Sequence, residues 1–449
     1  MIINQEAGPR KYQPITRDNI KKASIWSRLG PELRESILVV SAVLPFRTNN
    51  YVVEELIDWD RVPNDPMYQL TFPQRGMLSE FEYGRMEPLV LGNAPREEVQ
   101  AAANEIRYTL SPHPAGQLTH NRPVLDGQRL DGMQHKYRET VLFFPSQGQT
   151  CHAYCSFCFR WAQFVGIGDL QFASREVDTL VRYLKVHHEV SDVLFTGGDP
   201  MVMRSSNLAA YIEPLLTPEL SHIRNIRIGT KAVAYWPQRF VSDPDAGDVL
   251  RLFEKVGASG RQLAVMGHYN HPVEFSTPVA REAIQRIRST GAQIRMQSPM
   301  IRHVNDNADC WAEMWRTGVQ LGLIPYYVFV ERDTGAHHYF EIPLARVWDI
   351  YRKAYRQVSG LARSVRGPSM SAFPGKVKIL GVMKVQGEKR FVLEYIQARN
   401  PKMVRTPFFA QYDPLATWFD ELRPATADDA PFFNAWTYES DEELFSVIA

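Results

Sequence analysis

The stretch TVLFFPSQGQTCHAYCSFCFRW, residues 140–161, joins a short apolar run directly to three closely spaced cysteines. Five similar apolar runs follow along the chain: DVLFTGG, IRIGT, QLAVMGHY, AQIRMQS and IPYYVFV. Single amphipathic stretches separate them, at 175–186, 206–216, 246–256, 277–290 and 309–321. Strand-like runs that alternate with single helices predict right-handed βαβ units. We therefore expect an α/β fold with a parallel sheet, and the six repeats favour a partial (β/α)6 barrel of the TIM type.

Regions with a different sequence pattern flank these repeats. Residues 1–135 mix helical patterns with loops rich in Pro and Arg, which predicts a mainly α-helical N-terminal section. The barrel is expected over 136–335. The C-terminal region, 336–449, holds a helix-like stretch at 344–357, the hairpin pattern KILGVMKVQGEKRFVLEY and a polar tail.

Charge and composition argue against several classes of protein. The 51 Lys and Arg residues nearly cancel the 50 Asp and Glu residues, so no overall field attracts nucleic acid or an anionic membrane. No apolar run is long enough to span a bilayer, and the N-terminus lacks the layout of a secretory signal. Four cysteines, three of them clustered, favour a metal site over a disulfide framework. We expect a cytoplasmic protein that acts on a small molecule, with no nucleic-acid or membrane partner.

The clustered cysteines, Cys151, Cys155 and Cys158, follow the first strand-like run at its carboxyl end, where barrel active sites are assembled. The spacing C-x3-C-x2-C suits three corners of a [4Fe-4S] cluster, and the fourth iron then stays open for an external ligand. A zinc ion would need a further ligand such as His152 or Cys310, and the sequence has no second C-x2-C pair. The cluster is therefore favoured, and Cys310 is expected to be a small buried side chain.

The cysteine motif and its surroundings resemble the radical S-adenosylmethionine (SAM) superfamily, and within it the lysine 2,3-aminomutase family. The resemblance covers residues from about 43 to about 380, including HKY, TGGDP, RIGTKAVAYWPQRF, GHYNHPVEF and QSPMIRHVND. It implies that Cys151, Cys155 and Cys158 hold a [4Fe-4S] cluster whose open iron binds SAM. Reductive cleavage of SAM would give a 5′-deoxyadenosyl radical that abstracts hydrogen from an amino-acid substrate. A flavodoxin- or ferredoxin-type protein would supply the electron. Whether the chain forms a homo-oligomer is left open by the sequence.

The same resemblance suggests roles for other residues. Contacts to SAM are expected from Phe157, Gly197, Gly198, Asp199, Gln297 and Ser298. A bare GGDP is also a common tight turn, but here it follows the next strand after the cysteines. Arg160 is expected to grip the substrate carboxylate, since its planar fork can make two parallel hydrogen bonds. His268 and Asn270 are expected to line the substrate site.

The chain departs from the family where pyridoxal phosphate (PLP) would bind. Family members hold PLP as a Schiff base on a lysine that follows four glycines, whereas SAFPGKVKILG keeps one glycine, and either Lys376 or Lys378 could be the lysine. Tyr137 is kept, but Thr140 and Lys231 stand where the family has arginines. Lys231 still offers a point charge. PLP-dependent and PLP-free reactions therefore both stay open.

The substrate site differs as well. The two aspartates that receive the distal ammonium group of lysine in the family correspond to Arg332 and Ala372. An arginine there disfavours lysine and favours a carboxylate, carbonyl or phosphate, although Asp333 would restore an acidic contact if the register shifted by one. The sequence therefore predicts a 2,3-amino shift on an amino acid other than lysine. The alternatives are a PLP-independent elimination, decarboxylation or epimerisation on an amino acid or peptide, and a zinc-stabilised binding module.

Overall fold

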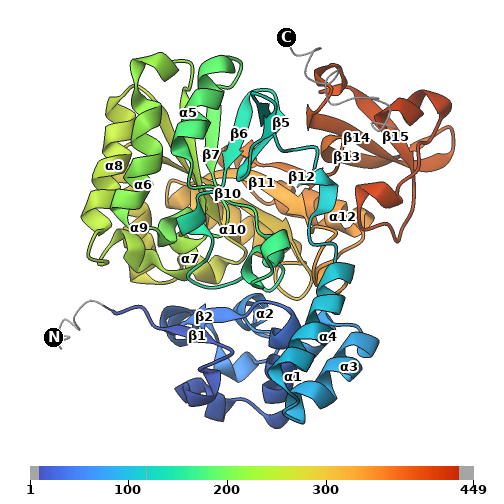
Figure 1. The fold of residues 1–449 in the computed structure, drawn as a ribbon. Coiled ribbons are helices and arrows are strands. Elements are labelled where there is room, and N and C mark those ends of the chain that lie inside the picture. The colour runs from blue at the N-terminus through green and yellow to red at the C-terminus, as the bar shows by residue number, and fades with distance from the viewer. Residues whose placement is uncertain (1–9, 118, 434–449) are drawn as a thin grey trace.

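A long mixed sheet forms the centre of the protein (Figure 1). The structure is a computed structural model, and it describes residues 10–117 and 119–433. Within these residues the sheet has eleven strands in the order β15-β14-β13-β12-β11-β10-β9-β8-β7-β6-β5. The six predicted strands lie side by side and run parallel: β6 (Thr140–Phe143), β7 (Asp192–Phe195), β8 (Asn225–Thr230), β9 (Gln262–His268), β10 (Gln293–Met300) and β11 (Ile324–Val330). The predicted α/β fold with a parallel sheet is confirmed.

Helices connect the parallel strands and cover the outer side of the sheet (Figure 1). They are α5 (Val177–Val186), α6 (Ser205–Ile212), α7 (Ala232–Tyr235), α8 (Ala246–Ala258), α9 (Pro278–Ser289) and α10 (Ala308–Gln320). Side-chain caps begin two of them: the Thr277 hydroxyl accepts a hydrogen bond from the Ala280 amide, and the Asn307 side chain accepts one from the Cys310 amide. The helices predicted from amphipathic patterns agree with these bounds to within a few residues.

The sheet is open. Beyond β11, strand β12 (Arg366–Ser371) is still parallel, whereas β13 (Gly375–Val385), β14 (Glu388–Ala398) and β15 (Pro407–Gln411) are antiparallel, and β5 (Met133–Tyr137) pairs antiparallel with β6. In the described part of the chain no ladder joins β5 to β15, so the parallel strands form a partial barrel. Helices α11 (His337–Phe340) and α12 (Leu344–Arg356) connect β11 to β12. The predicted hairpin is β13–β14, and the tail predicted beyond residue 433 lies outside the described residues.

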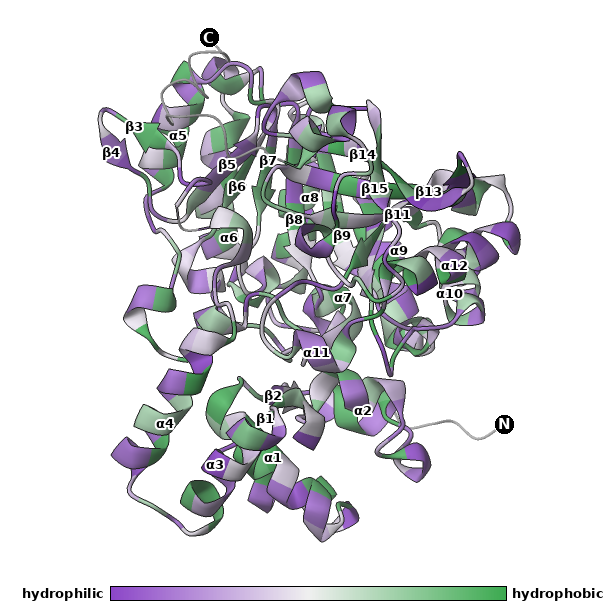
Figure 2. Ribbon diagram, turned by 90° about the vertical axis from the view of Figure 1, so that its right-hand side faces the viewer, coloured by the Kyte–Doolittle hydropathy of each residue, from purple (hydrophilic) through white to green (hydrophobic). Residues whose placement is uncertain are grey.

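The N-terminal section packs below the barrel in Figure 1. Its helices are α1 (Pro31–Val43), α2 (Pro66–Thr71), α3 (Glu80–Leu91) and α4 (Arg96–Thr109), and it also contains the paired strands β1 (Pro14–Thr16) and β2 (Arg47–Asn49). A small hairpin, β3 (Val124–Leu125) with β4 (Gln128–Arg129), precedes the barrel. Hydrophobic and hydrophilic residues alternate along α4 in Figure 2, and its buried side includes Ala103 and Ile106. No described helix is both long and apolar enough to cross a membrane.

The two sides of the parallel strands carry different side chains. On β8, Ile226 and Ile228 are fully buried, while the alternate residues Arg227 and Gly229 face a cavity. Because side chains alternate along a strand, one side packs on the helices and the other is left for polar groups. A bulge between Met296 and Gln297 of β10 interrupts its register with β11 just where Gln297 reaches the same cavity.

Candidate functional site

A cavity of about 350 Å³ lies at the carboxyl ends of the parallel strands. Strand residues on the inward side form its walls, among them Leu142, Leu194, Arg227 and Tyr327. Most of the predicted site residues line it: Tyr137, Cys151, Cys155, Phe157, Cys158, Arg160, Gly197, Gly198, Asp199, Lys231, His268, Gln297, Arg332 and Lys376. Asn270, Ser298 and Lys378 do not line it.

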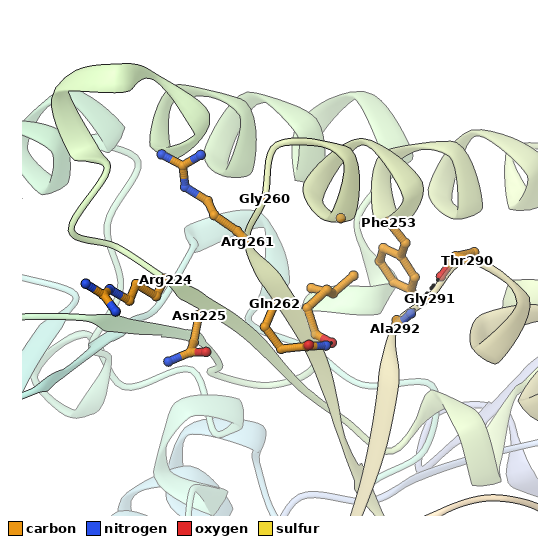
Figure 3. A pocket seen from close by; sticks show the side chains of 11 residues that line it. Arg224, Asn225, Phe253, Gly260, Arg261, Gln262, Thr290, Gly291 and Ala292 are labelled. Atoms are coloured by element: carbon orange, nitrogen blue, oxygen red, sulfur yellow. Dashed lines mark hydrogen bonds between the residues drawn. The ribbon is translucent and has the colours of Figure 1, made fainter.

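A second hollow, of about 440 Å³, lies at the opposite, amino ends of β8, β9 and β10 (Figure 3). Arg224, Arg261 and Gln262 contribute its polar side chains. The Arg261 guanidinium donates to the backbone oxygens of Thr217 and Leu220, so it fastens a turn at this end of the barrel. No cysteine lines this hollow, and the amino end of such barrels generally serves stability. The candidate active site is therefore the cavity at the carboxyl ends.

The N-terminal section holds the cysteine loop in place. The amides of Tyr154 and Ser156 donate to the backbone oxygens of Arg47 and Leu70, over 2.7 Å and 2.8 Å. The Arg47 guanidinium also donates to the Thr150 hydroxyl over 3.0 Å. Because these contacts lie on both sides of Cys151 and Cys155 and just before Cys158, the N-terminal section bonds directly to the cysteine loop.

The chemistry of the cysteines suits an iron–sulfur cluster. All three thiols are free and face the same cavity, and burial raises the pKa of Cys155 to about 11 and that of Cys158 to about 12. Metal binding would displace these protons, since thiolates are the ligands. Among the described residues no three His, Cys, Asp or Glu side chains are placed to hold one metal ion. A cluster needs wider ligand spacing, because each thiolate binds a different iron.

The alternative ligands for zinc lie elsewhere. Neither His152 nor Cys310 lines the cavity. The His152 ring stacks near Trp236, with ring centroids 6.4 Å apart, and Cys310 is buried in α10. The expected burial of Cys310 is confirmed.

The TGGDP loop packs directly against the cysteine loop. A Cβ at Gly198 would lie 2.5 Å from the Thr150 backbone oxygen, and Gly197 has a φ of +140°, so both positions require glycine. The Asp199 carboxylate accepts four hydrogen bonds, from the amides of Met201, Lys231 and Ala232 and the hydroxyl of Thr230. Asp199 therefore ties the loop after β7 to the loop after β8, and its predicted contact with SAM stays a prediction.

Lys231 is held in a buried polar network. Its ammonium group lies 2.6 Å from Glu274 and 2.8 Å from the Asn270 side-chain oxygen, and Asn270 in turn donates to Ser298 over 2.7 Å. Glu274 is fully buried, so the two charges neutralise each other. The network connects the loops after β8 and β9 to strand β10, and Asn270 and Ser298 lie behind the cavity wall.

The two candidate lysines of β13 occupy different surroundings. The Lys376 amine lies in the cavity, 4.2 Å from the centroid of the Tyr327 ring. Burial is the main reason that its pKa falls to about 8. Lys378 lies two residues along the strand and pairs with Glu394 at 3.6 Å, outside the cavity. The geometry therefore favours Lys376 as the nucleophilic lysine.

Two arginines share one aromatic ring at the cavity wall. The guanidinium carbons of Arg160 and Arg332 lie 4.9 Å and 5.6 Å from the centroid of Phe159. The Arg160 side chain makes no hydrogen bond or ion pair with any described residue, and burial is the largest factor that lowers its pKa to about 10. Its donors are free to bind a carboxylate. Arg332 lines the cavity and Asp333 does not.

His268 presents an unsatisfied group near the cysteine loop. Its Nε2 atom is buried without a hydrogen-bond partner among the described residues, and its ring centroid lies 5.8 Å from that of Phe157. Burial lowers its pKa well below the ordinary value, so the ring is neutral. A bound ligand would supply the missing partner.

Among the ionisable residues of the cavity that sequence reasoning missed are Lys136 and Glu331. Lys136 of β5 lines it and donates a hydrogen bond to the Ala372 backbone oxygen. Glu331, directly after β11, lines it with only 5% of its surface exposed, and burial raises its pKa well above the ordinary value. Lys136 lies in the HKY segment and Glu331 in the FVER segment. Strand register decides whether these side chains point into the cavity, and the sequence alone does not show that register.

Comparisons with known proteins identify relatives of this chain. No protein-family model matches the sequence. A putative L-lysine 2,3-aminomutase of Aquifex aeolicus is 30% identical over 88% of this chain and 92% of its own length. The L-lysine 2,3-aminomutase of Escherichia coli is 28% identical over 53% of this chain and 66% of its own. A radical SAM methyltransferase structure from Sphaerobacter thermophilus matches with a TM-score of 0.38 and 17% identity over 64% of this chain and 92% of its own.

A three-cysteine loop at the carboxyl end of a partial (β/α)6 barrel is the arrangement expected of a radical SAM enzyme, and the relatives show that this chain is one. The chain belongs to the lysine 2,3-aminomutase family. It is accordingly an enzyme of the isomerase type whose family uses a [4Fe-4S] cluster and SAM.

Proposed function

We propose that this enzyme moves an amino group between neighbouring carbons of an amino acid other than lysine. The observation that carries the proposal is Arg332, which faces the cavity where lysine-specific relatives need a carboxylate. A lysine ammonium group beside a buried guanidinium would leave two like charges without solvent, which costs several kcal/mol. Asp333 does not relieve this repulsion, because it does not line the cavity.

The cavity residues divide into three groups in this proposal. Cys151, Cys155 and Cys158 hold the cluster, and His268, Gln297 and Phe157 contact SAM or the substrate beside it. Together the cluster and SAM supply the radical that abstracts hydrogen from the substrate. Arg160 binds the substrate carboxylate with its unpaired guanidinium.

Lys376 would hold PLP in the same cavity. Its buried amine, with a pKa near 8, is suited to bond with an aldehyde carbon. Arg227 lines the cavity and acts electrostatically on Lys376, but its Nε donates to Asp192 over 2.7 Å, so only its remaining guanidinium donors could meet the phosphate. When bound, PLP supplies the electron sink through which an amino group migrates. Tyr137 also lines this cavity.

A reaction without PLP is the second candidate, and one observation favours it. The family's phosphate-binding charges are missing here, because Thr140 is uncharged and the charge of Lys231 is neutralised by Glu274. In that case the same radical would start an elimination, decarboxylation or epimerisation on an amino acid or peptide.

The test uses anaerobically reconstituted enzyme with SAM, a reductant and a panel of amino acids. We expect 5′-deoxyadenosine and a β-amino-acid isomer from an amino acid other than lysine, detected by mass spectrometry and NMR. Lys376→Met should abolish the isomer and keep the cluster spectrum, whereas Lys384→Met, an exposed lysine of the same strand, should change neither. Lysine as the preferred substrate would contradict the proposal, and isomer formed by Lys376→Met would favour the PLP-free reaction.

A further inference from the structure

The hydroxyl group of Tyr235 lies beside the sulfur of one of the three clustered cysteines. Its oxygen is 3.7 Å from Cys155 Sγ, and no other hydrogen bond joins this hydroxyl to a described residue. Tyr235 is only 1% exposed and does not line the cavity, so neither solvent nor a substrate in the cavity would meet the hydroxyl. A buried hydroxyl without a partner costs free energy, so the contact with Cys155 is the one that it has to keep.

One buried side chain holds the backbone on both sides of this contact. Asn49 of β2 donates from Nδ2 to the His152 backbone oxygen over 3.1 Å and to the Tyr235 backbone oxygen over 3.0 Å. The Tyr235 amide donates to the Lys231 backbone oxygen, and the Lys231 ammonium group lies 4.4 Å from the centroid of the Tyr235 ring. The cysteine loop and α7 are therefore fixed to a common point, which keeps the hydroxyl beside the sulfur.

Iron binding would decide the direction of this hydrogen bond. While the thiol and the hydroxyl both carry a proton, either group can donate. A cysteine that binds iron does so as a thiolate, which has no proton to give. The Tyr235 hydroxyl is then the donor and the Cys155 sulfur the acceptor. Such a bond stabilises negative charge on the sulfur, and hydrogen bonds to the sulfurs are one means by which proteins set the reduction potential of a cluster.

We propose that Tyr235 donates a hydrogen bond to the sulfur ligand Cys155 and thereby raises the reduction potential of the cluster. This inference rests on the proposed role of Cys155 as a ligand, and it does not depend on the substrate or on PLP. Reduction adds one electron from an external one-electron reductant, which takes [4Fe-4S]²⁺ to [4Fe-4S]⁺, and the hydroxyl keeps its proton. Because the sulfur ligands share the added negative charge, the hydrogen bond is stronger in the reduced form and favours reduction. Tyr235 acts through Cys155, so it is a positioning residue.

The experiment measures the midpoint potential of the reconstituted holoenzyme without SAM, by a redox titration followed with electron paramagnetic resonance. Tyr235→Phe removes only the hydroxyl, and at a fixed potential it should lower the ratio of reduced to oxidised cluster roughly threefold to tenfold. This change corresponds to a midpoint that is lower by about 30 to 60 mV, since a tenfold change is about 59 mV for one electron. Tyr269→Phe is the matched control, because Tyr269 is equally buried and its hydroxyl has no hydrogen-bond partner in the described part of the chain. The control should keep the wild-type potential.

A second protein distinguishes the hydrogen bond from an effect on packing. 3-Fluorotyrosine placed at position 235 keeps the ring and the hydroxyl, and its electron-withdrawing fluorine makes the hydroxyl a stronger donor, so the midpoint should rise above that of wild type. Opposite shifts in this protein and in Tyr235→Phe support the inference, whereas shifts of the same sign, or no shift in Tyr235→Phe, overturn it. If Tyr235→Phe takes up no cluster, a midpoint of the fluorinated protein at or below that of wild type overturns the inference. Wild-type protein that takes up no iron would refute the proposed ligand role of the cysteines, and this inference would fall with it.

Discussion

The pKa of Lys376 gives a prediction that can be worked out in numbers. The amine lies against Tyr327 and Phe329, and burial lowers its pKa from the ordinary 10.5 to about 8. At pH 7.5 roughly a quarter of such amines are neutral, against roughly one in a thousand for an ordinary lysine. Because the neutral amine is the nucleophile, Lys376 should react roughly 200-fold faster than an exposed lysine of equal access. Tyr327→Ser, which hydrates the amine, should remove most of this advantage.

Competitive acetylation measures this directly. Short pulses of labelled acetic anhydride across pH 6 to 11, followed by mass spectrometry, give the rate at Lys376 and at the exposed control Lys384. We expect the rate at Lys376 to reach half its maximum near pH 8, and at a higher pH in Tyr327→Ser. If Lys376 and Lys384 share one pH profile in wild-type protein, the buried-amine argument is refuted.

Three further predictions concern other parts of the site. Glu274→Ala should lower the free energy of unfolding by about 3–5 kcal/mol, because the Lys231 ammonium group stays buried without its partner; denaturant titration measures it, and a loss below about 1 kcal/mol would contradict the buried pair. Arg160→Lys should raise the substrate KM by roughly 10- to 100-fold with little change in kcat, since lysine lacks the two parallel donors; an equal fall in kcat would argue against a binding role. The raised pKa of Glu331 means that its folded form holds a proton which the unfolded form releases, so its contribution is complete below the ordinary pKa of about 4.5 and is lost as pH rises. Thermal unfolding from pH 5 to 8 should therefore show a smaller decline in Glu331→Gln than in wild type, and parallel curves would contradict the assignment.

The alternation of apolar runs and amphipathic stretches was sufficient to predict the six parallel strands, because each pattern reflects one face packed on helices. That the three cysteines share one cavity was equally predictable, since they lie within eight residues. The distinction between Lys376 and Lys378 was not. These lysines lie two residues apart on β13, so a regular strand would place both on one side. The pairing of β13 with β14 shifts register between Lys376 and Val377, and again between Ile379 and Gly381, and the local sequence does not show these irregularities.

Long-range pairing explains the spatial arrangements that sequence reasoning did not find. The Lys231–Glu274 pair joins residues 43 positions apart, and it forms because β8 and β9 are neighbours. Lys136 of β5 and Arg332, which follows β11, line the same cavity although they are distant in the chain. Neither contact has a local pattern, so both required the folded structure.

The central claim is that three thiolates hold a cluster with an open iron, and metal content tests it most directly. Anaerobically purified and reconstituted wild-type protein should contain about four irons and four sulfides per chain, and added SAM should change the electron paramagnetic resonance spectrum of the reduced cluster. Cys155→Ala should lose the cluster, whereas Cys310→Ala, a buried cysteine outside the cavity, should keep it. Wild-type protein that binds one zinc and no iron, or a cluster that survives Cys155→Ala, would contradict the account.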